Sequence, residues 1–80
     1  MKNKNLLSRI TINPDVLVGK PVIRGLRISV SQILNALANN VSVEDLLKDY
    51  PELEEEDIFA ALAYAAQRIG EEKIYKVDAA

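Results

Sequence analysis

The chain is short, mildly acidic, and contains neither cysteine nor histidine. Its 80 residues, of which 49% are apolar and 28% charged with a net charge of −2, suffice for one domain near the lower size limit for folding on a hydrophobic core alone. The missing residue types exclude disulfides, the usual zinc sites and imidazole-based catalysis. The longest apolar run, Ile58 to Ala66, is too short to span a bilayer, and no apolar signal segment follows the basic N-terminus, so we expect a cytoplasmic protein without membrane contact.

The charges are divided unevenly along the chain. Residues 1–27 hold six cations and one acid, whereas residues 28–80 hold four cations and eleven acids, so the two parts carry net charges of +5 and −7. This division predicts two different surfaces, the basic one suited to a polyanion or an acidic protein pocket. Charged tails and helix caps would produce the same division without any function.

The first third of the chain predicts a small β-arm over residues 9–28. Arg9 to Ile12 alternates polar and β-branched apolar residues, as a half-buried strand does, and Asn13-Pro14-Asp15 ends it. Val16 to Val18 follows as a short apolar return that Gly19 breaks. A second strand begins at Pro21, and because proline lacks an N–H group this strand belongs at an edge.

The second half of the β-arm is basic as well as apolar. Pro21 to Ile23 and Leu26 to Ile28 flank Arg24-Gly25, a tight turn with glycine where a positive φ is needed. The cations of this stretch predict a rigid surface for a polyanion. The alternative is a structural connection that its cations merely solvate.

The rest of the chain predicts three helices, near residues 30–39, 43–49 and 55–69. Ser29 with Gln32 forms a capping box before the first helix, and Ser42 caps the second, which Pro51 stops. Two short helices, a turn and a longer third helix are typical of a helix-turn-helix arrangement, although many small helical domains share this spacing and bind no nucleic acid. We expect the core to comprise Leu34, Leu37, Leu46, Leu47, Ile58, Leu62 and Ile69.

The third helix opens on four acids, Glu54 to Asp57. Carboxylates at this place would repel a phosphate backbone, so this helix is not expected to enter a major groove; the simplest interpretation is that they cap and solubilise it. A magnesium site for phosphodiester hydrolysis is the enzymatic alternative. Because successive side chains point about 100° apart on a helix and no nucleophile or base accompanies them, we expect no catalysis, no metal and no cofactor.

Apolar residues continue nearly all round the third helix, and Phe59 and Tyr64 are the largest of those outside its core stripe. So small a domain cannot bury every face of its longest helix, which predicts an interface with a partner or a homodimer. The alternative is that Phe59 packs back beneath the β-arm.

Three segments of the chain resemble domain-of-unknown-function family 433. They are Gly19 to Val30, Asp49-Tyr50-Pro51, and Ile58 to Ala65, in the family's order, and the similarity extends from about Arg9 to Ala66. Leu26 and Ser29 depart from it, since the family more often has threonine and proline there.

The resemblance implies a mainly α fold, a homeodomain-like three-helix bundle of the helix-turn-helix kind with a short N-terminal β-arm. It also implies a type II toxin–antitoxin system, in which the chain would neutralise a PIN-like ribonuclease toxin and repress its own promoter. The alternative is a DNA-binding regulator that acts without a toxin. We expect one domain over residues 1–80, divided into the arm (9–28), the three-helix core (29–70) and a tail (71–80).

The site residues follow from these expectations. Promoter DNA is assigned to the cations of the arm, which are Arg9, Lys20, Arg24 and Arg27. The partner protein is assigned to aromatic and basic residues of the third helix and tail, which are Phe59, Tyr64, Arg68, Lys73, Tyr75 and Lys76. Two segments qualify for inhibition of an acidic cleft, the arm with Arg24 and Arg27 and the C-terminal tail. The tail is favoured, because no core contact is evident for it and it could order on binding.

Overall fold

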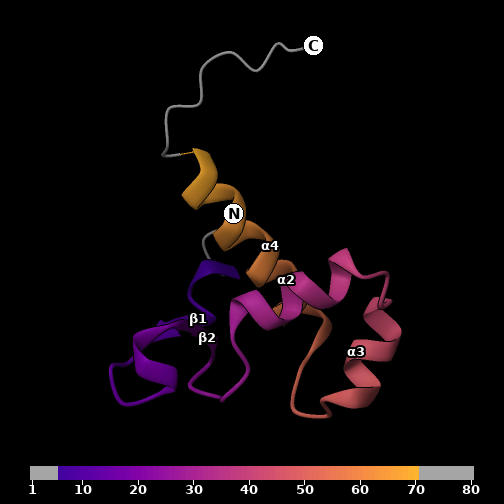
Figure 1. Cartoon of the computed structure of the whole chain (residues 1–80), viewed down its shortest axis with the longest axis horizontal. Coiled ribbons are helices and arrows are strands. Elements are labelled where there is room, and N and C mark those ends of the chain that lie inside the picture. The colour runs from indigo at the N-terminus through magenta and orange to yellow at the C-terminus, as the bar shows by residue number, and fades with distance from the viewer. Residues whose placement is uncertain (1–5, 71–80) are drawn as a thin grey trace.

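The structure, a computed structural model of the chain, describes residues 6–70. Three helices pack beside a two-stranded antiparallel sheet (Figure 1), as predicted. None of the described helices is long and apolar enough to cross a membrane. In chain order the elements are β1 (Ile10–Ile12), the short 3-10 helix η1 (Leu17–Gly19), β2 (Pro21–Ile23), α2 (Val30–Ala38), α3 (Val43–Asp49) and α4 (Glu55–Gly70).

The two strands pair with Ile10 opposite Ile23 and Ile12 opposite Pro21. The predicted turn after β2 is confirmed: the Leu26 N–H donates to the Ile23 carbonyl at 2.7 Å, and Arg24 and Gly25 have φ values of 43° and 72°. Two consecutive positive φ values define a type I′ turn, which matches the twist of the flanking chain. Val22 bridges to Ser29 across it, so the arm leads directly into α2.

The segment between the strands differs from the prediction. Val16 to Val18 was expected as an apolar return, but Leu17–Gly19 forms η1, and Val18 is 89% exposed with a φ of 58°. The physical reason is that β1 and β2 pair directly with each other, so this segment is the connection that reverses the chain between them. Hydrogen bonds to Asn13 organise the connection instead, from the Val16 N–H to its carbonyl and from the Asp15 N–H to its side chain.

The three helices follow the predicted bounds closely because their ends are set by local chemistry. Ser29 and Gln32 make the expected reciprocal capping box, with N···O distances of 3.0 and 2.9 Å, and Ser42 accepts from the Asp45 N–H. Asn40 has a φ of 71°, the left-handed conformation in which helices commonly end.

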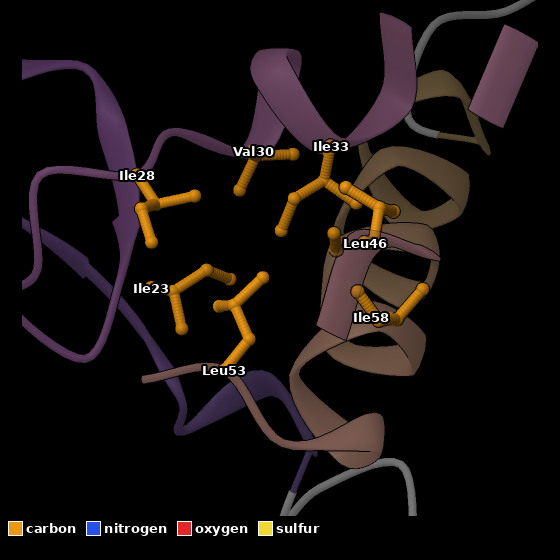
Figure 2. Packing of buried hydrophobic residues seen from close by; sticks show 8 residues of the cluster. Ile23, Ile28, Val30, Ile33, Leu46, Leu53 and Ile58 are labelled. Atoms are coloured by element: carbon orange, nitrogen blue, oxygen red, sulfur yellow. The ribbon is translucent and has the colours of Figure 1, made fainter. Parts of the chain in front are cut away.

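The core lies where the arm meets the three helices (Figure 2). Its buried members come from β2, from α2, α3 and α4, and from the segments that precede α2 and α4: Ile23, Ile28, Val30, Ile33, Leu46, Leu53, Ile58 and Ala61. Of the predicted core, Leu46 and Ile58 are buried, and Leu34, Leu37 and Leu47 pack against it partly buried.

The prediction of the core is wrong at two positions of α4. Leu62 is 44% exposed and Ile69 is 56% exposed. The buried side of α4 contains Ala60 and Ala61, so Leu62 lies on another side, and the last turns of the helix continue past α2 and α3 (Figure 1). Helical spacing identified apolar faces correctly but could not tell which one the arm and the other helices cover.

Candidate functional site

The acidic start of α4 is joined to the β-arm by two arginines. Arg24 reaches both Asp57 carboxylate oxygens, at 3.0 Å from Nε and 2.8 Å from Nη2. Arg9 contacts Asp57 at 2.9 Å and both Glu54 and Glu56 at 2.8 Å. Asp57 itself is fully buried, and its second oxygen also accepts the Glu54 N–H at 2.8 Å. We call these five side chains the Asp57 cluster.

The electrostatics of this cluster favour a charged carboxylate. Burial acts to raise the pKa of Asp57, but the hydrogen bonds from Arg24, from the Glu54 N–H and from Arg9 outweigh it and hold that pKa below its usual range. The side-chain hydrogen bond to Glu54, followed by that to Asp57, raises the pKa of Arg9, and the hydrogen bond to Asp57 raises the pKa of Arg24, so both guanidinium groups stay protonated.

This arrangement corrects two expectations. The acids of residues 54–57 were interpreted as an exposed cap, yet Asp57 is buried. The basic first third and the acidic remainder were expected to form separate surfaces, yet Arg9 and Arg24 are bound to acids of α4 and the turn before it. A local pattern does not reveal such contacts, because Arg9 and Asp57 are 48 positions apart in the chain.

The remaining cations of the arm lie differently. Lys20 and Arg27 are exposed, and within the part of the chain that the structure describes neither makes an ion pair. On α4, Arg68 lies over the ring of Tyr64, with its guanidinium carbon 6.0 Å from the ring centroid. Exposed cations therefore remain on both the arm and the third helix.

Lys20 and Arg68 both line a hollow of about 350 Å³ that lies between the arm, α2 and α4. We call it the α2–α4 hollow. The residues that line it are mainly apolar: Lys20, Pro21, Ser29, Val30, Ser31, Leu34, Tyr64, Ala65 and Arg68. Both of its charged lining residues are cations. A second hollow of similar size, which Leu17 and Val18 also line, adjoins it at Lys20, Ser29 and Ser31.

The structure brings some of the predicted site residues together and separates others. Lys20, Tyr64 and Arg68 line the α2–α4 hollow, although Lys20 was assigned to DNA and the other two to a partner protein. Phe59 is 44% exposed, so the arm leaves much of its side chain uncovered. Lys73, Tyr75 and Lys76 lie outside the described residues, as does the rest of the tail.

The sequence prediction missed the contribution of α2 to this hollow. Leu34 is predicted as a core residue and Val30 is assigned to no site, although both supply part of its apolar lining. Their spacing of four places them on one face of the helix, which is the signal available in the sequence. The same signal cannot indicate that Lys20 and Arg68, far apart in the chain, flank that face.

Comparisons with known proteins agree with the resemblance and add little on activity. Residues 10–65 match the model of the family described as "Protein of unknown function (DUF433)". The chain is 41% identical over 56 residues to "Uncharacterized protein y4eO" of Sinorhizobium fredii, a match that covers 70% of this chain and 25% of that protein. The chain thus spans about a quarter of the length of this relative. No solved structure matches it.

Proposed function

Because this chain belongs to domain-of-unknown-function family 433, we propose that it is a cytoplasmic antitoxin that binds and neutralises a PIN-like ribonuclease toxin. The proposal rests on what the family resemblance implies and on the surface that the structure displays. In this role the chain is not an enzyme. Arg9 and Arg24 occupy the carboxylates at the start of α4, which supports a structural role for those acids.

The observation that supports this proposal best is the α2–α4 hollow. Its apolar lining suits a protein side chain, and Lys20 and Arg68 at its rim suit carboxylates. A PIN-like ribonuclease uses clustered carboxylates to hold its metal ion, so its cleft is negative and attracts such a surface. Phosphate alone would not require Leu34 and Tyr64 beside the cations, which favours a protein partner here.

Repression of the chain's own promoter is a second role, supported by Lys20 and Arg27. Both cations are exposed on the arm, where they are available to phosphates. The start of α4 is acidic, so the arm and not this helix would contact DNA. A stand-alone DNA-binding regulator is the corresponding alternative function if no toxin is bound.

The test is co-expression of the full chain with the product of the neighbouring gene, followed by co-purification and a ribonuclease assay. We expect a stable complex without ribonuclease activity. The double variant Lys20→Ala/Arg68→Ala should weaken the complex at least tenfold, because both charges at the hollow are removed. Lys48→Ala is the matched control, since Lys48 is an exposed cation on α3 away from the hollow.

The outcomes separate the two functions. Absence of any complex, together with DNA binding that weakens steeply with salt, would favour the stand-alone regulator. A complex that the double variant leaves unchanged would remove the hollow from the mechanism. Truncation after Gly70 then tests the tail: full inhibition by the shortened chain would exclude residues 71–80 from neutralisation.

A further inference from the structure

A stripe of exposed apolar residues follows α4 on the side away from the core. Phe59 and Leu62 are each 44% exposed and Ile69 is 56% exposed, with exposed Ala66 between them. We call these four residues the α4 stripe. The fully buried Ala60 and Ala61 lie on the other side of the helix, so the stripe is distinct from the face that completes the core.

The spacing of the α4 stripe is that of a helix–helix contact. Its members follow one another at intervals of three, four and three residues. This is the a/d spacing with which one helix packs against another in coiled coils. Packing within the domain does not account for the stripe, because its three large members, Phe59, Leu62 and Ile69, remain exposed.

A hollow of about 600 Å³ lies beside the stripe, between α4 and the N-terminal segment. Leu7, Leu62, Ala63, Ala66 and Gln67 line it. Of the two stripe residues that line it, Leu62 is large and Ala66 is small. A two-fold rotation that sets Leu62 of one copy against Ala66 of another places a large side chain against a small one at both contacts, so the stripe is complementary to itself.

The charges at the start of α4 select the direction of pairing. Glu55 precedes Phe59 by four positions and continues the same stripe toward the N-terminus. In a parallel pair the two Glu55 side chains would lie against each other, which is unfavourable. An antiparallel pair separates them, opposes the two helix dipoles, and sets Phe59 of one copy against Ile69 of the other and Leu62 against Ala66.

We propose that α4 pairs antiparallel with α4 of a second copy of this chain, through Phe59, Leu62, Ala66 and Ile69, with the two-fold axis midway between Leu62 and Ala66. The stripe extends over about 15 Å of helix, so the interface belongs to the small class that buries under about 1,200 Å² in total. The dimer therefore dissociates on dilution. This pairing does not depend on whether the chain binds a nuclease or DNA.

Sedimentation equilibrium of the full chain over a range of concentrations tests the interface. Leu62→Glu and Ala66→Arg should each raise the dimer dissociation constant at least tenfold, the first by charge and the second by bulk. Arginine is a good helix former, so Ala66→Arg leaves the helix intact. Val18→Glu is the matched control, an exposed apolar residue on η1 that should leave the constant unchanged.

Disulfide cross-linking tests whether the two helices run antiparallel. The chain contains no cysteine of its own, so a single introduced cysteine reports on one position. On oxidation Ala63→Cys should form a disulfide-linked dimer, because this position lies near the two-fold axis, whereas Glu55→Cys should not. A disulfide through Glu55→Cys would establish a parallel pair and overturn the proposal. So would a monomer at every concentration, or a dimer that neither Leu62→Glu nor Ala66→Arg weakens. If the chain is monomeric and Leu62→Glu abolishes binding of a different protein, the stripe belongs to that partner instead.

Discussion

At the scale of single residues, the buried carboxylate of Asp57 holds the β-arm on α4. Replacing it with asparagine would remove the one carboxylate that pairs with Arg24 among the described residues, and one of the three that pair with Arg9. We expect Asp57→Asn to lower the free energy of unfolding by about 3 kcal/mol, the low end for breaking a buried pair, because both guanidinium groups retain contact with water. Urea denaturation measures this loss. Glu55→Gln is the control and should change stability by less than about 0.5 kcal/mol.

The same carboxylate predicts a dependence of stability on pH. Because its pKa is held below the usual value, the unfolded chain binds a proton at Asp57 more readily than the folded chain does. Its contribution is therefore complete above the ordinary aspartate pKa and is lost as pH falls below about 4. Denaturation midpoints between pH 7 and pH 2 should fall more steeply for the wild type than for Asp57→Asn. Parallel curves would contradict this account.

At the scale of elements, α4 presents two apolar sides with different roles. Ile58 is fully buried in the core, whereas Leu62 is half-exposed on the stripe. We expect Ile58→Ala to cost about 2–5 kcal/mol and Leu62→Ala less than about 1 kcal/mol. Chemical denaturation of both variants, at a concentration where the chain is monomeric, measures the difference. If both variants lose the same free energy of unfolding, Leu62 is a core residue and this account of α4 is wrong.

The turn of the arm is the second element whose chemistry is specific. Gly25 has a φ of 72°, and a Cβ placed there would meet no atom within 4 Å, so the backbone conformation and not space requires glycine. Gly25→Ala should cost about 1 kcal/mol, and Gly25→Asn less, because asparagine tolerates the left-handed region. Thermal denaturation gives the comparison. Gly70→Ala, at a position without a positive φ, should cost nothing.

At the scale of the complete domain, the cations of the arm fall into two groups, those paired within the chain and those left exposed. Arg9 and Arg24 are bound by acids of the same chain, whereas Lys20 and Arg27 remain open to a partner. If promoter DNA is bound through the arm, Lys20→Ala/Arg27→Ala should weaken binding and reduce the salt slope by about two, because each cation neutralises one phosphate. Fluorescence anisotropy at several salt concentrations measures it. Glu55→Gln is the control and should leave the salt slope unchanged. An unaltered slope in the double variant would show that Lys20 and Arg27 do not contact phosphates.

Much of the architecture could be predicted because the interactions that determine it are local. The caps at Ser29 and Ser42 and the turn at Arg24-Gly25 depend on neighbours within a few residues, so the helices and the hairpin were found almost at their observed bounds. The candidate site was predicted less well. Tyr64 and Arg68 were identified together, but their proximity to Lys20 was not.

The order of the amino acids was enough to predict the two strands and the three α-helices, to exclude cysteine and histidine chemistry, and to indicate the family. Which charges stay free, and which apolar side of α4 is covered, depends on how the elements pack in three dimensions. The physical reason is distance along the chain: Arg9 and Glu54 are 45 positions apart, and periodicity describes a helix without describing what packs on it. Packing of the arm against α4 buries Asp57, neutralises two arginines, and leaves Phe59, Leu62 and Ile69 exposed.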